Sequence, residues 1–330
     1  MTVANDYDCL LLDLDGTIWE GGRPIPGAIE GVEATGLPLC YITNNASKSP
    51  AVVAEQLSGI GLATDPHHVL TSAQAAIEMA AQEIPAGAKL LILGTESFRQ
   101  LASDAGFVVV TSADEHPDAV LQGHSPATGW AELSEASMAI HQGARYFASN
   151  LDTTLPQERG LAVGNGSMVA AVVSATGVTP VAAGKPKPTM FFSAAQKLHA
   201  QRPLAVGDRL DTDIAGGVAA GMDAFQVLTG VSGYYDVLNA PIEQRATYLA
   251  ESLIDLGSPA SELVPHAQDG FTATFVDGVV ELSGGNEQST PIASLRTAVS
   301  VVWSEGTVGN SVREVRGMSE HARRVLQVWW

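Results

Sequence analysis

The chain has 330 residues, of which 45% are apolar and 16% charged, a composition typical of a compact globular protein. Acidic residues outnumber basic ones 36 to 17, which gives a formal net charge of −19. Little basic surface is left to neutralise a nucleic-acid backbone or an anionic membrane, so neither is expected as a partner. A phosphate site in so acidic a protein needs a local cation, a metal ion or converging backbone amides to reverse the field.

The N-terminal residues and the cysteines indicate an unexported protein. Asp6 and Asp8 stand where a secretory signal would carry Lys or Arg, so we expect a cytoplasmic location. Cys9 and Cys40 each lie in an apolar run and are expected to be buried free thiols. Residues 161–184 contain no charged residue, but a proline and several glycines interrupt them. We therefore expect a buried loop, helix and strand there rather than a membrane span.

Short apolar runs that end in a polar residue predict the buried strands of a parallel sheet. They are residues 9–13, 39–43 and 204–208, and helical patterns occupy residues 27–35, 50–60, 72–84 and 189–200. The alternation of strands and helices predicts a doubly wound α/β core with its chemistry at the carboxyl ends of the strands.

The middle of the chain, residues 89–177, repeats this alternation with strands of its own. These are predicted at residues 89–93, 107–111, 119–122 and 145–148. The polar strand ends Asp13, Thr43 and Asp208 fall on both sides of the region. We therefore predict a second α/β domain that is inserted into the first.

The sequence changes character again beyond about residue 250. Asp277-Gly278, between two apolar runs, is a strong signal of a β-hairpin of residues 271–277 and 279–282. A polar loop and two helices, residues 291–304 and 319–330, are expected to follow. The predicted domains are a core of residues 1–85 and 179–250, an insertion of residues 86–178, and a small α+β extension of residues 251–330.

The most informative motif is Asp13-Leu14-Asp15-Gly16-Thr17, directly after the first predicted strand. The strand delivers Asp13 to the carboxyl edge of the sheet, and Gly16 permits a bend that brings Asp15 back toward it. Two carboxylates so placed can divide the work. Asp13 stays ionised as nucleophile and metal ligand, while Asp15 acts as general acid and then as general base.

Polar residues after the second strand and a lysine near residue 185 are candidates for binding phosphate. Thr43, Asn44 and Asn45 offer donors without negative charge, and backbone N–H groups at the start of the next helix add to them; a plain turn with an N-cap is the alternative. Lys185 would offset the repulsion between Asp13 and a phosphoryl oxygen. Lys187 is a rival for that role.

Three carboxylates, Asp208, Asp211 and Asp213, follow the last predicted core strand. Hard oxygen ligands beside a phosphoryl group suit Mg²⁺, which keeps several waters and needs only one or two protein carboxylates. Asp208 is the best placed ligand, and Asp213 is expected to position a ligand or a water. Whether Asp211 or Asp213 assists the metal is open at this point.

The order of these four elements resembles the haloacid dehalogenase (HAD) superfamily. The resemblance implies a nucleophile at Asp13, a general acid/base and backbone-carbonyl metal ligand at Asp15, phosphate contacts at Thr43 and Lys185, and a metal carboxylate at Asp208. It also implies an HAD-like core with Mg²⁺ as cofactor.

Further motifs resemble one branch of this superfamily, which contains NagD-type, pyridoxal phosphate, phosphoglycolate and 4-nitrophenyl phosphatases. They are residues 25–28, 43–49, 150–152, 164–172 and 207–214. The branch carries a C2-type cap where the insertion is predicted here, and Asn150 and Asp152 match a signature expected to order that cap. Caps in this branch often pair, which implies a homodimer.

Over its whole length the chain resembles bacterial glycerol 3-phosphate phosphatases that carry an extra C-terminal region. In that resemblance residues 251–330 look like a fragment of a GNAT-type acetyltransferase fold. They lack a Gly-rich loop for the pyrophosphate of acyl-CoA, so we expect packing or subunit contacts from them and no catalysis.

The implied activity is hydrolysis of a small phosphometabolite through an aspartyl-phosphate, with glycerol 3-phosphate as the expected substrate. Phosphoglycolate, a nucleotide or pyridoxal phosphate is the alternative substrate. A phosphomutase would return the phosphate to its substrate, and a dehalogenase is disfavoured because it needs neither Asp15 nor a magnesium cluster. From another class, a phosphometabolite-binding module without turnover is the alternative.

Overall fold

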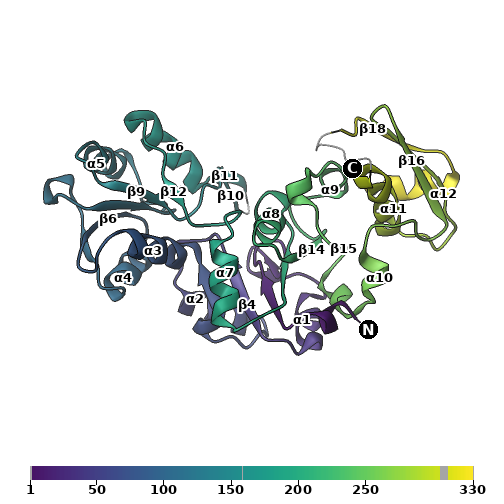
Figure 1. Cartoon of the computed structure of the whole chain (residues 1–330), viewed down its shortest axis with the longest axis horizontal. Coiled ribbons are helices and arrows are strands. Elements are labelled where there is room, and N and C mark those ends of the chain that lie inside the picture. The colour runs from purple at the N-terminus through teal and green to yellow at the C-terminus, as the bar shows by residue number, and fades with distance from the viewer. Residues whose placement is uncertain (1, 158, 305–310, 330) are drawn as a thin grey trace. The chain divides into compact units, whose positions relative to one another are not determined.

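The computed structural model describes residues 2–157, 159–304 and 311–329 (Figure 1). The chain divides into two compact units, one of residues 1–39 and 197–330 and the other of residues 40–196. It passes from one unit to the other inside strand β4 (Leu39–Thr43) and again at the end of helix α7 (Thr189–Lys197). The predicted core, insertion and extension have other boundaries, and these stay a prediction.

The first unit contains four parallel strands in the order β15-β14-β13-β1. All residues of β1 are buried, so the apolar run that predicted this strand is explained by cover on both faces. Strands β1 and β13 pair from Cys9↔Pro203 to Leu12↔Val206, which brings their carboxyl ends together. The elements up to residue 263 are β1 (Cys9–Leu12), β2 (Trp19–Glu20), β3 (Arg23–Pro24), α1 (Ala28–Thr35), β13 (Pro203–Gly207), a π-helix (Leu210–Ile214), α8 (Ala215–Ala219), β14 (Asp223–Val227), α9 (Tyr234–Leu238), β15 (Tyr248–Ala250) and α10 (Ala260–Leu263).

A three-stranded sheet in the order β16-β17-β18 follows in the same unit. The predicted hairpin is confirmed, because Asp277 and Gly278 both have positive φ, 49° and 78°, as a two-residue hairpin turn requires. The predicted helix 291–304 is α11, and the final helix is shorter than residues 319–330, with Trp330 outside the described residues. The elements are β16 (Phe271–Val276), β17 (Val279–Gly284), α11 (Pro291–Ser304), β18 (Glu314–Gly317) and α12 (Glu320–Leu326).

One hydrophobic cluster joins these C-terminal elements to the rest of the first unit. Its members include Leu210, Ile214, Ala224, Val237, Leu238, Leu249, Phe271, Val280, Leu282, Ile292, Leu295, Val299, Val325 and Trp329. Apolar side chains from before and after residue 250 are therefore buried in the same cluster. The C-terminal elements share a core with β14, α8 and α9 and do not build a separate one.

Arg296 strengthens this junction from within α11. The side chain is only 6% exposed, and its Nε and Nη2 donate to the backbone oxygen of Leu249 at 2.9 and 2.5 Å. Nη1 donates to Oε1 of Gln268 at 3.2 Å. Burial lowers the pKa of Arg296, and the carboxylates of Asp255 and Glu251 oppose that shift. A buried guanidinium held in this way ties α11 to β15.

The second unit contains a five-stranded parallel sheet in the order β12-β9-β8-β6-β7. Helices α5 and α6 lie over one face of this sheet and α3 and α4 over the other (Figure 1). The chain leaves β6 for β7 on one side and then crosses to β8 on the other, so the strand order reverses between β6 and β8. The elements are α2 (Pro50–Gly59), β5 (Val69–Thr71), which pairs with β4, α3 (Ser72–Glu83), β6 (Lys89–Leu93), α4 (Glu96–Asp104), β7 (Val108–Val110), β8 (Ala119–Gln122), α5 (Trp130–His141), β9 (Arg145–Ala148), β10 (Thr154–Gln157), β11 (Gly160–Val163), α6 (Asn165–Thr176) and β12 (Val181–Ala182).

Some local predictions differ from the structure. Helix α7 ends at Lys197 instead of residue 200, because His199 adopts a left-handed conformation with φ 54°. Residues 161–184 begin in the hairpin β10–β11 rather than in a buried loop, and Leu161 is 72% exposed. Among the described residues no helix is long and apolar enough to cross a membrane. Cys9 and Cys40 are buried free thiols, as predicted.

The shared core predicts that a cavity in α11 destabilises the first unit. Leu295→Ala should lower the free energy of unfolding by about 2–5 kcal/mol, the usual cost of removing a buried Leu side chain. Urea unfolding followed by circular dichroism measures it. Val328→Ala is the control, because Val328 lies in the same unit and is 57% exposed. A loss for Leu295→Ala no larger than for Val328→Ala would contradict the shared core.

Candidate active site

Three carboxylates meet at two neighbouring strand ends of the first unit. Asp13 follows β1, Asp208 follows β13, and Asp213 lies in the π-helix. One oxygen of each lies within 4.8 Å of the others, and Asp208 and Asp213 are buried. The Asp13 N–H still donates to the oxygen of Val206 at 2.9 Å, so strand pairing carries on into this acidic cluster. Hard oxygen donors at such spacing fit a divalent cation.

Asp15 directly precedes Gly16, where the structure has a turn; that this turn brings Asp15 back toward Asp13 stays a prediction. Gly16 has φ 93°, and its N–H donates to the oxygen of Trp19 at 2.8 Å. The indole Nε1 of Trp19 in turn donates to Oδ1 of Asp15 at 2.9 Å. The Asp15 carboxylate is therefore oriented by an aromatic donor four residues further along the chain.

A loop of residues 229–233 holds Asp208 in place. The N–H of Val231 donates to Oδ2 of Asp208 at 2.7 Å, and Thr17 Oγ1 donates to Oδ1 at 3.3 Å. In addition, Nε2 of the buried Gln226 donates to the backbone oxygen of Asp208 at 2.7 Å. A Cβ at Gly230 would overlap the Asp208 carboxylate, so only glycine lets the loop approach this closely.

Asp211 and Asp213 have different surroundings. Asp213 accepts from the N–H of Arg209 at 3.0 Å and from Thr212 Oγ1 at 3.3 Å, and it belongs to the acidic cluster. The side chain of Asp211 is 59% exposed and pairs with the Arg209 guanidinium, with Nη2 to Oδ2 at 2.8 Å. Of these two residues, Asp213 is the one placed to assist a metal.

Lys185 and Thr43 are buried in the second unit, 4% and 3% exposed. Nζ of Lys185 donates to the backbone oxygen of Ile42 at 3.1 Å, which directs the ammonium toward the end of β4. Lys187, its rival, is exposed. The predicted phosphate-binding residues thus gather at one strand end of this unit, and the acidic cluster is in the other unit.

Asn44 links three segments of the second unit. Its Oδ1 accepts from the N–H of Lys185 at 2.9 Å, and its Nδ2 donates to the oxygen of Lys185 at 3.1 Å. The same Nδ2 reaches Oδ2 of Asp152 at 3.1 Å, and the backbone oxygen of Asn44 accepts from Asn150 Nδ2 at 2.7 Å. One amide side chain therefore fixes the backbone on both sides of Lys185. Asn150 and Asp152 thus bond to Asn44, and a role for them in ordering a cap stays a prediction.

The neighbouring residue Asn45 closes the loop after β4. Its N–H donates to Thr43 Oγ1 at 3.1 Å, and its Oδ1 accepts from the N–H and the hydroxyl of Ser47 at 2.8 and 2.6 Å. Thr43, Asn44 and Asn45 thus form a compact turn in the structure.

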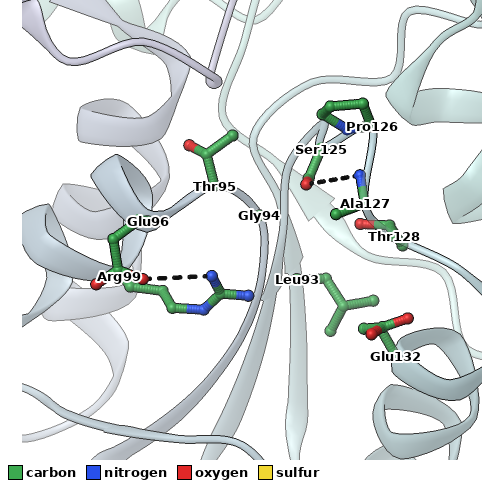
Figure 2. A pocket seen from close by; sticks show the side chains of 10 residues that line it. All are labelled: Leu93, Gly94, Thr95, Glu96, Arg99, Ser125, Pro126, Ala127, Thr128 and Glu132. Carbon is green, nitrogen blue, oxygen red and sulfur yellow. Dashed lines mark hydrogen bonds and ion pairs between the residues drawn. The ribbon is translucent and has the colours of Figure 1, made fainter.

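A cavity of about 310 Å³ lies at the carboxyl ends of β6 and β8, where the strand order of the second unit reverses (Figure 2). Its lining consists of Leu93, Gly94, Thr95, Glu96, Arg99, Ser125, Pro126, Ala127, Thr128 and Glu132. Such reversal points often bind ligands in α/β proteins. Arg99 pairs with Glu96 at 3.6 Å and faces Glu132, so its charge is already offset. A phosphate group would therefore gain little electrostatic stabilisation in this cavity. None of the predicted catalytic residues lines it.

Comparison with known proteins assigns the chain to a family. Residues 10–108 match a model of haloacid dehalogenase-like hydrolases, and residues 182–256 match a model described as HAD-hydrolase-like. D-glycerol 3-phosphate phosphatase of Mycobacterium tuberculosis is 38% identical over 99% of this chain and 95% of the relative. The acid sugar phosphatase of Staphylococcus aureus is 36% identical over 78% of this chain and 98% of its own length.

The chain belongs to the haloacid dehalogenase-like hydrolases. The crystal structure of glycerol phosphate phosphatase from Mycobacterium tuberculosis in complex with magnesium superimposes with a TM-score of 0.93 at 38% identity, covering 100% of this chain and 98% of the other. A 4-nitrophenylphosphatase from Thermotoga maritima gives a TM-score of 0.73 at 27% identity, with 79% of this chain and 100% of the other covered.

This HAD-like hydrolase is a phosphatase of the NagD and 4-nitrophenylphosphatase branch, as predicted from its motifs. The predicted fold class, a doubly wound parallel core with an inserted α/β region and a small C-terminal α+β part, is confirmed as well.

Sequence reasoning missed several residues around the site. Trp19 donates to the Asp15 carboxylate, Gln226 donates to the backbone oxygen of Asp208, and Gly230 lets a loop approach Asp208, but none of the three belongs to a charged motif. Gln226 left one signal, a lone amide within the apolar run Ala224–Val227. Gly230 signalled only a turn, because its closeness to Asp208 depends on the fold.

The contacts of Asn44 predict a structural cost when its side chain is removed. Asn44→Ala leaves the Lys185 N–H without this acceptor, and the free energy of unfolding should fall by about 1–3 kcal/mol. Urea denaturation of the full chain measures this cost. Gln56→Ala on the exposed side of α2 serves as control. Equal stability of the two variants would show that the Asn44 contacts contribute nothing.

Proposed function

We propose that this HAD phosphatase is a magnesium-dependent phosphomonoesterase acting on a small phosphometabolite, with glycerol 3-phosphate as the best candidate. The observation that carries the proposal is the cluster of Asp13, Asp208 and Asp213 at adjacent strand ends. The similarity to a D-glycerol 3-phosphate phosphatase over 99% of the chain supports the choice of substrate.

In the first proposed step Asp13 is the nucleophile. A carboxylate oxygen of Asp13 forms a bond to phosphorus while the bond from phosphorus to the ester oxygen breaks, which leaves an aspartyl-phosphate. Asp15 donates its proton to the departing alkoxide. The bond from Trp19 Nε1 to Oδ1 of Asp15 orients the carboxyl group that carries this proton.

In the second step water attacks the phosphorus of the aspartyl-phosphate. Asp15, now ionised, accepts a proton from that water, and the bond between phosphorus and the Asp13 oxygen breaks. Inorganic phosphate and free Asp13 result. The same group acts as acid and then as base, as microscopic reversibility requires.

The remaining polar residues would hold the phosphoryl group and the metal. Lys185, Thr43, Asn45 and the backbone N–H of Asn44 are assigned to the phosphoryl oxygens, because the Asn44 side chain is already engaged with Lys185 and Asp152. Asp13, Asp208 and the backbone carbonyl of Asp15 are assigned to Mg²⁺, with Asp213 as positioning carboxylate. Mg²⁺, when bound, would neutralise charge that develops on the phosphoryl oxygens.

Substrate choice is assigned to the insertion, proposed as a C2-type cap of residues 86–178 that excludes water and shapes the leaving-group pocket. Phosphoglycolate, a nucleotide and pyridoxal phosphate are the competing substrates. A homodimer and a cytoplasmic location stay predictions from the sequence. A binding module without turnover is the rival class, and tight ligand binding with no release of phosphate would favour it.

The nucleophile is tested by Asp13→Asn, which should reduce phosphate release by at least about a thousandfold, as expected for loss of a catalytic nucleophile. The free energy of unfolding without metal should stay equal or rise, because one of three crowded negative charges is removed. Asp211→Asn is the matched control and should keep activity within about threefold of native, since its charge lies at the surface. Equal activity of Asp13→Asn and native protein would refute the mechanism.

A substrate panel tests the leaving group. Glycerol 3-phosphate should give the largest kcat/KM among glycerol 3-phosphate, phosphoglycolate, a nucleoside monophosphate and pyridoxal phosphate, measured as release of inorganic phosphate. A higher kcat/KM for one of the other three would reassign the substrate and leave the phosphatase mechanism standing.

Metal removal is the third test. Chelation with EDTA should abolish phosphate release, and added MgCl₂ should restore it, because the single positive charge of Lys185 and neutral hydrogen-bond donors do not offset the charge of the acidic cluster and a phosphate. Asp208→Asn should bind Mg²⁺ at least about tenfold more weakly in calorimetry. Full activity in EDTA would exclude a metal from the reaction.

A further inference from the structure

The C-terminal elements α11, β18 and α12, described here over residues 291–304 and 311–329, have no role in the proposed chemistry. The family models end at residue 256. The Staphylococcus aureus relative aligns over 98% of its own length, but with only 78% of this chain. The phosphatase fold is thus complete in a relative that lacks a counterpart for part of this chain. The additional residues need a function of their own.

The loop of residues 229–233 touches both motifs that build the acidic cluster. Thr229 Oγ1 donates to the backbone oxygen of Gly16 at 2.6 Å, and the N–H of Val231 donates to Asp208 Oδ2 at 2.7 Å. Ser232 Oγ accepts from the N–H of Leu210 at 3.0 Å, where the π-helix begins. A displacement of this loop therefore displaces Asp208.

Helix α9 starts directly after this loop and fixes its end. The N–H of Gly233 donates to Oδ2 of Asp236 at 2.9 Å, and the N–H of Val237 donates to the oxygen of Gly233 at 3.1 Å. With five residues, α9 is far too short to be stable by its own hydrogen bonds. Its position depends on what packs against it.

The C-terminal elements supply that packing. The Tyr235 hydroxyl donates to the oxygen of Val312 at 2.6 Å, and the N–H of Val312 donates to Oδ1 of Asn239 at 2.9 Å. The ring of Tyr234 stacks on Trp329 with 5.7 Å between centroids and 24° between planes. Val312 and Trp329 are 3% and 5% exposed, so these contacts lie in the interior of the unit.

We propose that the C-terminal elements act as a positioning device for the metal site. They fix α9, α9 fixes residues 229–233, and this loop fixes Asp208, so that the C-terminal elements set the affinity of the acidic cluster for its divalent cation. The inference rests on the proposed function in one respect, that the cluster binds Mg²⁺. Mg²⁺ demands near-ideal octahedral geometry, so a small displacement of one carboxylate lowers its affinity.

The test measures Mg²⁺ binding by isothermal titration calorimetry on the full chain. Tyr235→Phe removes the hydroxyl that Val312 accepts from, and Trp329→Leu removes the stacking partner of Tyr234 while keeping an apolar side chain. Each variant should raise the Kd for Mg²⁺ by about three- to tenfold, somewhat less than loss of a direct partner of a metal ligand. The Mg²⁺ concentration for half-maximal phosphate release should rise in parallel, and kcat at saturating Mg²⁺ should return to the native value.

Two controls separate positioning from general loss of stability. Val110→Ala removes buried methyl groups from β7 in the second unit and should lower stability without changing the Kd for Mg²⁺. Val328→Ala changes an exposed side chain next to Trp329 and should change neither. A native Kd in Tyr235→Phe and Trp329→Leu, or an equal rise in Val110→Ala, would overturn the inference and leave the proposed function intact. Absence of Mg²⁺ binding by the native protein would overturn both.

Discussion

The first unit is organised around the mutual repulsion of three carboxylates held within 4.8 Å of one another. At an effective dielectric constant of about 20, two unit charges at this separation repel by on the order of 3–4 kcal/mol. Among the donors to Asp208 and Asp213 are backbone N–H groups and hydroxyls, which orient the carboxylate oxygens. Arg209, one cation close in sequence, turns its guanidinium to the exposed Asp211. Three carboxylate oxygens at this spacing could hold a divalent cation.

Many contacts near the acidic cluster join residues that are far apart in the sequence, and strand pairing explains them. Thr17 reaches Asp208 across 191 residues, and Thr229 reaches Gly16 across 213. Parallel pairing of β1 and β13 brings the two strand ends together, and only then can the loops around them interlock. The hydrophobic cluster that continues from α8 and α9 into α11 stabilises this arrangement from behind. Charge crowding at the strand ends is thus offset by apolar burial elsewhere in the unit.

The sequence predicted the parts of the molecule that are local. The strands β1, β4 and β13 followed from apolar runs, and α11 and the Asp277-Gly278 turn followed from periodicity and turn chemistry. It did not predict β14 or β15, or the exposed hairpin β10–β11, which carries no clear alternation of apolar and polar residues.

The candidate site shows the same division between local and long-range information. Charged residues in motifs, such as Asp13 and Lys185, were found because their chemistry can be recognised from the sequence alone. Trp19, Gly230 and the side-chain role of Asn44 were not found, because a donor or a close approach acquires meaning only when a distant partner is in place.

The stretches of the chain that the family models match differ in content from the stretches that the models leave unmatched. The family models cover residues 10–108 and 182–256, and every residue proposed to act on phosphate or metal lies inside those ranges. The stretches between and beyond them hold most of the five-stranded sheet of the second unit and the elements that anchor α9. The matched ranges contain the strand ends where the carboxylates, the hydroxyl and the lysine of the proposed site lie. In our proposal the elements that anchor α9 act on the metal site indirectly, because a carboxylate that binds a metal is only as well placed as the loop and the helix that hold it.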